Sequence, residues 1–365
     1  MDFQLSEERQ MLADMLNRFV RDEYPIGVRH KAAAMEGGFD PAMWAQMAEL
    51  GAVGALIPAE AGGFGGMGED IAVVFEALGR GIVVEPFLST GILGATALVG
   101  GEKMDLLEEV VAGTKLLALA HTEADSRYEM SRVGCKADGD RITGQKSVVL
   151  NAATADLLIV SARSSGDIDD EDGLDLYLVD AKDAGVSMRS YGMVEGGHAS
   201  EVTLNGAVGE KLPGGYLLLE RVLGAGVLAL CAEALGAMEV CKETTLEYLK
   251  TRKQFGVNLG RFQALQHRMV EMTIAIEQAR SITMLAAGQF EADRLTRERT
   301  LSAAKNLISR VARLVSEETI QLHGGIAMTW EYSAPHYAKR LTMIDHLLGD
   351  EDFHLYRFLH LGDAA

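Results

Sequence analysis

Apolar side chains recur at helical spacing through the first third of the chain. Between residues 11 and 20 they return every three or four positions, which predicts a helix with one buried face. Ser6 precedes this run as a favourable N-cap. A second helix is predicted with Asp40 as N-cap, Pro41 at its first position and Gly51 just beyond its end. We therefore expect an N-terminal helical domain over residues 1–115.

The pattern changes to short β-type runs between residues 116 and 212. These runs are rich in β-branched and aromatic side chains, and turn signals such as Asp138-Gly139-Asp140 separate them. Such spacing predicts a small antiparallel sandwich or barrel. The acidic stretch at 164–173 is expected to be a mobile loop between two strands. The runs are SRVGCKA, SVVL, LLIVSA, LDLYLVD and EVTL.

Helical periodicity returns from residue 216 and dominates the rest of the chain. The apolar faces are long and broad, as expected for a bundle that also buries surface between subunits. The predicted fold is mainly α with a central β-domain, divided into residues 1–115, 116–212 and 213–365. The predicted bundle helices cover 216–250, 260–290, 295–322 and 334–348, with a short helix near the end.

Charge narrows the classes of partner. Lys and Arg total 34 against 53 Asp and Glu, which gives a formal net charge of −19. So acidic a surface repels phosphate backbones and anionic lipids, so we expect neither nucleic acid nor a membrane surface as a partner. An anionic small ligand would need a locally basic pocket.

The apolar and cysteine content point to a cytoplasmic protein. The most apolar stretch, residues 222–238, contains Glu233 and is shorter than the roughly 20 residues that span a bilayer, so it is predicted to be a buried helix. The first ten residues lack the basic and apolar regions of a signal peptide. Three cysteines, at 135, 231 and 241, form no metal-binding pattern, and an odd count favours reduced thiols.

The segment GFGGMG at 63–68 fits the dinucleotide-binding pattern G-x-G-x-x-G, and Glu85 follows at a plausible distance. That fingerprint also requires a strand directly before it and a continuing alternation of strands and helices. Here Pro58 interrupts the preceding segment, and helical texture resumes after Pro86. A glycine-rich turn between helices is therefore favoured over a dinucleotide site.

The C-terminal stretch LTMIDHLLGDEDFHLYRF places His346, Asp350 and His354 four residues apart. On one continuous helix they would share a face and could ligate a metal ion. Gly349, however, is a natural residue to end the helix predicted at 334–348, and a break there separates the three side chains. Asp350 would then cap the next short helix. The pattern favours a helix junction, and no metal site is predicted.

Two further stretches combine features that suit a pyrophosphate. TRKQFGVNLGRFQALQ, residues 251–266, places two cations beside an amide, an aromatic and a glycine at a helix end. QLHGGIAMTWEY, residues 321–332, closes another helix with Gln321 and a glycine pair. An arginine supplies charge-assisted hydrogen bonds, and a tight glycine turn allows close backbone approach.

Together these motifs resemble the acyl-CoA dehydrogenase family. RKQFG followed by FQ, and QLHGG, match its C-terminal signatures, and IPAEAGGFGGMGEDIAVVFEALGR matches its N-terminal pattern. TEAD at 122–125 looks like an altered T-E-P motif, and GQKSVVLNAATADLLIVSAR matches the segment leading into the flavin-side strand. The resemblance covers essentially the whole chain in the right order. It implies an N-terminal helical domain, a central β-domain and a C-terminal four-helix bundle.

The resemblance also implies a reaction, a cofactor and partners. The family oxidises acyl-CoA thioesters to 2,3-enoyl-CoA with bound FAD: a carboxylate removes the α-proton while the β-hydride passes to the flavin. It implies an acyl-CoA substrate, electron-transfer flavoprotein as electron acceptor, and a homo- or hetero-oligomer, either a dimer or a tetramer. The implied cofactor-binding residues are Arg252, Gln254 and Phe255 toward the FAD of a neighbouring subunit, Gln321, Gly324 and Gly325 toward its ADP portion, and Thr122 and Asn151 on the flavin side of the β-domain.

The sequence departs from the family at the flavin cover. The family usually carries a Trp-Ile-Thr triplet over the flavin, and the corresponding residues here are Val148, Val149 and Leu150. A threonine hydroxyl near the flavin ring is therefore missing.

A second departure concerns the catalytic base. The slot of the usual glutamate holds Leu348, and a second family position for the base falls on Gly226. Asp350, two residues beyond Leu348, is the remaining candidate base. Such tails resemble the small subunit of pimeloyl-CoA dehydrogenase and the heteromeric acyl-CoA dehydrogenases of steroid degradation, in which two chains can share flavin sites.

Two hypotheses stay open, and a third, a Rossmann NAD enzyme, rests on GFGGMG alone. In the first, the chain is an acyl-CoA dehydrogenase subunit that acts on a CoA thioester in fatty acid or steroid catabolism. In the second, it is a non-catalytic partner that completes the FAD or acyl-CoA site of another chain.

Overall fold

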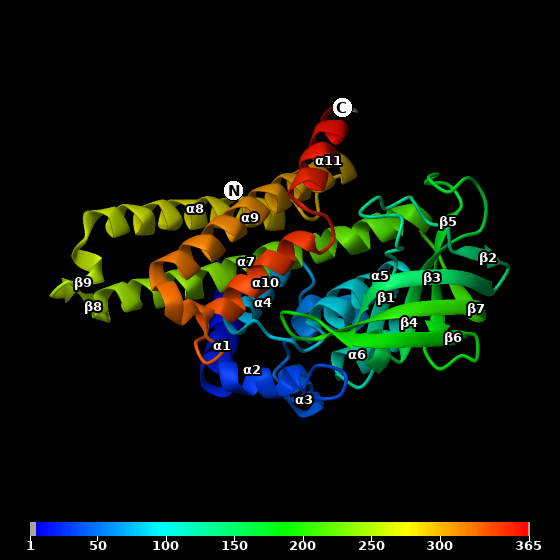
Figure 1. The fold of residues 1–365 in the computed structure, drawn as a ribbon. Coiled ribbons are helices and arrows are strands. Elements are labelled where there is room, and N and C mark those ends of the chain that lie inside the picture. The colour runs from blue at the N-terminus through cyan, green and yellow to red at the C-terminus, as the bar shows by residue number, and fades with distance from the viewer. Residues whose placement is uncertain (1–4, 364–365) are drawn as a thin grey trace. The chain divides into compact units, whose positions relative to one another are not determined.

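The computed structural model describes residues 5–363, which divide into two compact units. One, the bundle unit, combines the residues up to Arg29 with Met67–Val83 and the residues from Val227 onward. The other, the barrel unit, combines His30–Gly66 with Val84–Gly226. The long helix α7 (Gly215–Thr251) begins in the barrel unit and continues through the bundle unit (Figure 1). The domain boundaries predicted from the sequence stay predictions.

Strands of the barrel unit close into a ring. β4 pairs with β2, β2 with β3, β3 with β7 and β7 with β5, and β5 pairs back onto β4. β1 extends the ring through a parallel pairing with β4, and β6 pairs antiparallel with β7. The predicted barrel is confirmed, with parallel pairings that the sequence did not reveal. The strands are β1 Leu117–Ala120, β2 Lys136–Asp138, β3 Arg141–Leu150, β4 Leu157–Arg163, β5 Leu174–Asp180, β6 Val186–Gly192 and β7 His198–Leu212.

Short helical segments of the same unit pack around these strands. The π-helical segment Phe87–Gly94 is tied to β1, because the Thr90 hydroxyl donates to the carbonyl of Leu117 (3.1 Å) and accepts from its N–H (3.0 Å). The other segments are α3 Pro41–Glu49, η1 Gly54–Leu56, η2 Ala59–Ala61, α5 Ala95–Gly100 and α6 Met104–Val111, while α2 Ile26–Ala33 lies at the unit boundary. The predicted cap is present, because Asp40 Oδ1 accepts from the N–H of Ala42 (2.9 Å).

The acidic loop 164–173 lies between β4 and β5, as predicted. The guanidinium of Arg163, at the end of β4, donates to the carbonyls of Ser131, Ile168 and Asp170 at 2.7–3.0 Å. The loop is thus bound to the barrel through its own backbone. The sequence pattern did not indicate this attachment, because one residue outside the loop supplies all of these donors.

The GFGGMG segment is not a dinucleotide loop. The residues before it form the 3₁₀ turns η1 and η2 instead of a strand. A Cβ at Gly63 would lie 2.0 Å from the carbonyl oxygen of Ile57, and one at Gly65 would lie 2.0 Å from that of Ala55. These glycines are therefore required because the turn packs against its own backbone, as the prediction of a turn between helices implied.

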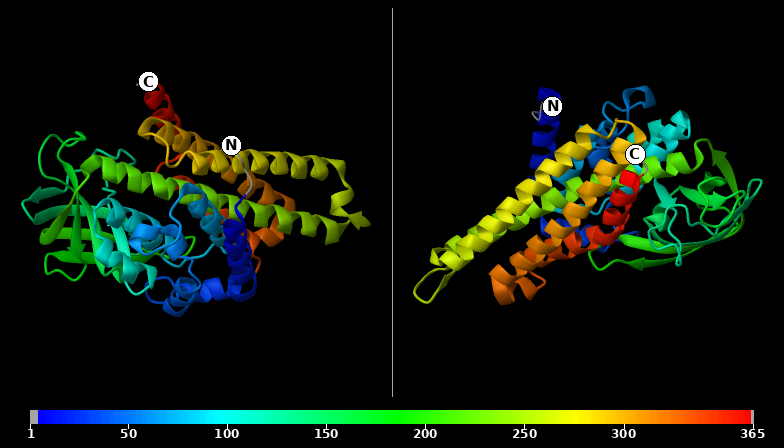
Figure 2. Two further views of the ribbon diagram at one scale, coloured as in Figure 1. Left: turned by 180° about the vertical axis from the view of Figure 1, so that it is seen from behind. Right: turned by 90° about the horizontal axis from the view of Figure 1, so that it is seen from above.

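The bundle unit consists of long helices. α8 and α9 lie side by side, and α10 and α11 pack on α9 (Figure 2). All four bundle helices predicted from the sequence are present within two residues at each end, except that the second starts three residues later. The predicted cap of α1 is confirmed, since Ser6 Oγ accepts from the N–H of Arg9 (3.3 Å). The elements are α1 Glu7–Glu23, α4 Gly68–Gly81, α7, β8 Lys253–Gln254, β9 Val257–Asn258, η5 Leu259–Arg261, α8 Gln263–Gly288, α9 Arg294–His323, η6 Gly324–Met328, α10 Ala334–His346 and α11 Glu351–Asp363.

Helices α4 and α7 approach each other through glycines. A Cβ at Gly79 would lie 2.0 Å from the carbonyl oxygen of Glu233, and one at Gly236 would lie 1.9 Å from that of Glu76. α7 is long and apolar enough to cross a membrane, but its most apolar window is entirely buried in the structure. The prediction of a buried helix is therefore confirmed.

Candidate functional site

A hairpin at the end of α7 holds an aromatic side chain out from the bundle unit. Lys253–Gln254 pair with Val257–Asn258 across a two-residue turn. Both turn residues have positive φ, 53° at Phe255 and 83° at Gly256, as a type I′ turn requires. A bulky residue is unusual in this conformation, and Phe255 is 90% exposed. A strained and exposed aromatic is typical of a residue placed for binding.

Several cations surround this hairpin. Lys250, Arg252, Lys253 and Arg261 fall within twelve residues, and no ion pair or hydrogen bond engages their side chains within residues 5–363. The amide side chain of Gln254 is likewise unengaged within that range and is exposed. In a chain with a net charge of −19, these residues form a locally basic surface, which can attract an anionic group.

The second sequence signature lies at the same end of the bundle unit. The ring of Tyr248, one turn before Arg252, is 4.6 Å from the ring of His323, centroid to centroid. His323 ends α9 and precedes Gly324 and Gly325. Two signatures about 70 residues apart in the chain are thus brought together.

The glycine pair leaves room for close approach. Gly324 has φ 66°, and no heavy atom lies within 4 Å of a Cβ built on Gly324 or Gly325. The side-chain amide of Gln321, exposed on the last turn of α9, has no hydrogen-bond partner in the described part of the chain. This exposed backbone beside unpaired cations fits a pyrophosphate-containing cofactor such as FAD.

His323 was not a candidate from the sequence. Burial lowers the pKa of His323, and its Nδ1 lies 2.8 Å from the carbonyl oxygen of Thr319. The ring is therefore neutral near pH 7 and acts as a packing contact between the two signatures. Its position in the last turn of α9, directly before two glycines, is the sequence feature that could have identified His323 as part of the site.

Thr122 and Asn151 lie in the barrel unit. The carbonyl of Thr122, just after β1, accepts from the N–H of Ser147 (2.8 Å). Asn151 directly follows β3 and has φ 56°, and its Oδ1 accepts from the hydroxyl of Ser89 (3.0 Å) in the π-helical segment. Both residues therefore sit at fixed positions on the connections that leave these strands.

Residues 148–150, which the sequence resemblance aligns with the family's flavin cover, adopt an irregular geometry. Pairing of β3 with β7 shifts by one residue between Lys146 and Val149, which marks a β-bulge. Val148 lies in this bulge with φ 53° and is 45% exposed, whereas Val149 is buried. A left-handed conformation is a clear outlier for a β-branched residue, and such outliers cluster at functional sites.

The α10–α11 junction breaks the face that a metal site would have needed. α10 ends at His346, and Asp350 caps α11 through Oδ1, which accepts from the N–H of Phe353 (2.9 Å). A Cβ at Gly349 would lie 2.5 Å from Nε2 of His354, so only glycine fits between the helices. The predicted junction and cap are confirmed. Within the described residues, no three His, Cys, Asp or Glu side chains could together hold a metal ion.

Buried groups fix this junction from two helices. Lys305 of α9 is fully buried and donates to the carbonyls of Asp345 (3.1 Å) and Gly349. Nε2 of His354 lies 2.9 Å from the carbonyl oxygen of Leu348, which itself has φ 56°. Burial lowers the pKa of Lys305 to about 8 and that of His354 to about 3, so the imidazole is neutral and Nε2 is the donor.

Carboxylates near Leu348 are engaged elsewhere. Asp345 Oδ1 accepts from the N–H of Glu351 (3.1 Å), and Glu351 pairs with Arg313. Asp350 uses one oxygen in its cap. The backbone at Leu348 is thus held in place by hydrogen bonds, and the neighbouring carboxylates stabilise the helix junction.

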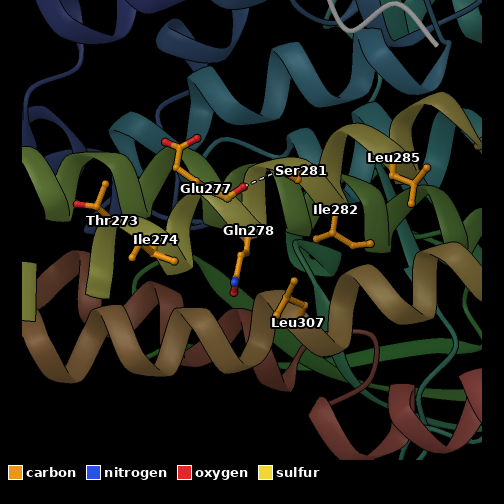
Figure 3. Close-up of a pocket in the computed structure, with 8 residues that line it drawn as sticks. All are labelled: Thr273, Ile274, Glu277, Gln278, Ser281, Ile282, Leu285 and Leu307. Carbon is orange, nitrogen blue, oxygen red and sulfur yellow. Dashed lines mark hydrogen bonds between the residues drawn. The ribbon is translucent and has the colours of Figure 1, made fainter. Parts of the chain in front are cut away.

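An apolar groove runs along α8 beside α9 in the bundle unit (Figure 3). Its volume is about 620 Å³, and Leu307 of α9 faces it from the opposite wall. Ile274 on α8 is 55% exposed, as is Val270 at 56% one turn earlier. Apolar side chains this exposed in a row mark an interaction surface. Lining residues are Thr273, Ile274, Glu277, Gln278, Ser281, Ile282, Leu285 and Leu307.

Comparison with known families places the chain. Residues 6–100 match the acyl-CoA dehydrogenase N-terminal domain, and residues 214–357 match the acyl-CoA dehydrogenase C-terminal domain. The chain belongs to the acyl-CoA dehydrogenase family. The resemblance seen in its motifs is therefore confirmed, as are the N-terminal helices, the central barrel and the C-terminal helical domain of this family.

Individual relatives match over nearly their whole length. The chain is 30% identical to the acyl-CoA dehydrogenase IpdE2 of Mycolicibacterium smegmatis, over 94% of this chain and 96% of that protein. A structure of the Tcur3481-Tcur3483 steroid ACAD matches with a TM-score of 0.89 and 29% identity, over 98% and 99% of the two chains. The ChsE4-ChsE5 complex from Mycobacterium tuberculosis has the same fold, with a TM-score of 0.89 at 23% identity and full coverage of both chains.

Proposed function

We propose that this chain is an FAD-dependent acyl-CoA dehydrogenase subunit that takes part in α,β-dehydrogenation of a CoA thioester. The observation that carries this proposal is the group of cations beside the open glycine pair at one end of the bundle unit, whose side chains have no partner among residues 5–363. Exposed cations gathered at one place in so acidic a chain form a locally positive surface, which attracts an anionic ligand. FAD supplies the acceptor for a hydride when bound.

Each part of the site has a proposed role. Arg252 would donate charge-assisted hydrogen bonds to the pyrophosphate, and Phe255 would cover part of the nucleotide. Gly324 and Gly325 would let the backbone approach the ADP portion. Gln254 and Gln321 would bind this cofactor, the FAD of a neighbouring subunit, through their amides. Thr122 and Asn151 would lie on the flavin side of the chain's own barrel unit.

We further propose that the usual carboxylate base is absent. Leu348 occupies its slot, Asp350 serves mainly as the cap of α11, and the other nearby carboxylates are paired. This favours the second hypothesis, in which the chain completes the FAD or acyl-CoA site of a partner and has little activity alone. Under either hypothesis, Arg252 and the pair Gly324-Gly325 of this chain would take part in cofactor binding.

We propose a second chain of the same fold, identical or homologous, as the occupant of the α8 groove. Burying an exposed apolar helix face against a similar face of a second chain is more favourable than leaving it in contact with water. Two of the relatives above are themselves named as pairs of different chains. The assembly would be a dimer or tetramer in the cytoplasm, with electron-transfer flavoprotein as electron acceptor and a role in fatty acid or steroid catabolism.

The decisive experiment measures flavin retained by purified protein. Arg252→Glu replaces attraction by repulsion at the pyrophosphate, and we expect a loss of about 3 kcal/mol in FAD affinity, roughly a hundredfold. Lys182→Glu, which reverses an exposed cation on the barrel unit, is the matched control and should retain FAD. Equal retention in wild type and Arg252→Glu would refute the assignment.

The two hypotheses separate in a co-expression experiment. The chain is purified alone and together with the product of a neighbouring dehydrogenase gene, and flavin per chain and acyl-CoA oxidation are measured. Activity only in the pair supports the partner role. Full activity and full flavin content in the chain alone would support the catalytic role and exclude the partner role.

A further inference from the structure

A chain of hydrogen bonds inside the barrel unit ends at His121, which directly follows β1. Lys146 is fully buried, and its Nζ donates to Glu123 Oε1 (2.7 Å), Ser161 Oγ (2.9 Å) and the carbonyl of His121 (3.1 Å). Ser161 is equally buried, and its Oγ lies 2.9 Å from Nδ1 of His121. The ammonium group therefore holds the backbone of His121 directly and its ring through Ser161.

These contacts decide which ring nitrogen of His121 carries the hydrogen. An ammonium group only donates, so Ser161 Oγ accepts from Lys146 and keeps its own hydrogen for another partner. Within residues 5–363 that partner is Nδ1 of His121, and a buried hydroxyl that donated to nothing would cost free energy. Burial, and then the charge of Lys146, lowers the pKa of His121 to about 3, so the ring is neutral near pH 7. Nδ1 therefore accepts, and Nε2 carries the hydrogen.

No residue within 5–363 uses the Nε2–H group of His121 as a donor. This nitrogen is also not one of the buried polar atoms that lack a partner in that range. His121 is half-buried, so Nε2 is accessible from outside the barrel. A neutral N–H donor that is fixed in one tautomer suits a carbonyl oxygen or a ring nitrogen of a ligand.

His121 lies beside a residue of the proposed cofactor site. Thr122 follows it directly and is exposed, and its carbonyl accepts from the N–H of Ser147 (2.8 Å). Glu123, on the other side of Thr122, is buried and bound to Lys146. Because both neighbours of Thr122 are bound to one buried lysine, His121 and Thr122 are fixed together on the connection that leaves β1.

We propose that His121 is a further cofactor-binding residue, which donates from Nε2 to a carbonyl oxygen or ring nitrogen of the flavin. Ser161 and Lys146 are positioning residues that set its tautomer. The identity of the ligand rests on the proposed function, and the motifs of that site include Thr122 but not His121. The tautomer rests on the hydrogen bonds alone.

The first experiment determines the tautomer in flavin-free protein. NMR of protein labelled with ¹⁵N-histidine shows which ring nitrogen carries the hydrogen, and His121→Gln identifies the signal by its loss. We expect hydrogen on Nε2 in wild type, a mixture of tautomers in Ser161→Ala, and no change in Ser190→Ala, which alters an exposed serine of β6. Hydrogen on Nδ1 in wild type would overturn the proposal.

The second experiment measures FAD affinity and the midpoint potential of the bound flavin. His121→Leu removes the donor, and we expect the dissociation constant to rise about fivefold, as the loss of a neutral hydrogen bond implies. The potential should fall, because a donor stabilises the more electron-rich reduced flavin. His121→Gln, which restores an N–H donor, should recover most of both effects. His360→Gln, which alters an exposed histidine of α11, should change neither.

The other outcomes each decide one part of the proposal. An equal loss in His121→Leu and His121→Gln would show a packing role, and weaker acyl-CoA binding at unchanged FAD affinity would assign the donor to the substrate; either result overturns it. If His121→Leu does not fold, Ser161→Ala should weaken FAD binding about twofold by freeing the tautomer, and no change would refute the role of His121.

Failure of the proposed function has a different signature. Wild type that binds no FAD would overturn the proposed function, and with it the flavin as the ligand of His121. Wild type that binds FAD, together with unchanged affinity and potential in a folded His121→Leu, would overturn the assignment of His121 alone.

Discussion

The buried pair Lys146–Glu123 offers the sharpest stability prediction. Lys146 has no exposed surface and Glu123 is about 10% exposed at its side chain, with 2.7 Å between Nζ and Oε1. Lys146→Met keeps an unbranched apolar stem and removes the charge. Glu123 would then keep only the N–H donors of Gly134 (2.8 Å) and Cys135 (3.0 Å). An uncompensated buried charge remains.

The expected cost follows from that remaining charge. Removing one partner of a buried ion pair costs about 3–5 kcal/mol, and the two surviving N–H donors place the loss near 3 kcal/mol. Changing both residues, Lys146→Met with Glu123→Gln, leaves no buried charge and should cost less than Lys146→Met alone. The coupling between the two sites is therefore expected to be at least about 2 kcal/mol.

The measurement is urea unfolding of the four proteins of this double-mutant cycle, followed by circular dichroism. Lys211→Met is the matched control, because Lys211 pairs with Asp175 in the same barrel at 2.7 Å but is 54% exposed. That exposed pair should contribute at most about 1 kcal/mol. A loss below 1 kcal/mol for Lys146→Met, or single effects that simply add, would refute the reasoning.

Three further predictions concern the bundle unit. We expect Leu348→Glu to oxidise acyl-CoA roughly 10²–10⁴-fold faster than a weakly active or inactive wild-type chain, and Asp350→Asn to leave turnover unchanged. Robust wild-type turnover that Asp350→Asn abolishes would instead make Asp350 the base. Burial lowers the pKa of Lys305 to about 8 in the folded chain, so the unfolded chain binds more protons between pH 8 and 10.5. The free energy of unfolding of wild type, relative to that of Lys305→Met, should therefore rise with pH across that window. A flat or falling difference in pH-dependent unfolding contradicts this. Ile274→Asp should yield a smaller assembly by light scattering, and an unchanged mass would remove the α8 groove from the interface.

Local signals in the sequence determined most of the elements. Ser6 and Asp40 cap the helices that follow them because a side-chain oxygen satisfies an N–H in the first turn, whatever the rest of the chain does. Gly349 ends the α10 face and Asp350 starts α11 for equally local reasons. The periodicity of the bundle helices and the family motifs needed no tertiary information either.

Tertiary structure alone decided the unusual backbone at Val148 and the burial of two lysines. Nothing local to Val148 predicts a left-handed bulge, because the sequence there favours a regular strand, and the bulge arises where β3 pairs with β7, about fifty residues further along the chain. No pattern in the sequence marks Lys146 or Lys305 as buried, and only the closed barrel and the packed helices provide the carboxylate and carbonyls that bind them there. The sequence determined local preferences for helix, strand and cap. Contacts between residues far apart in the chain, which no spacing pattern encodes, determined where the structure departs from those preferences.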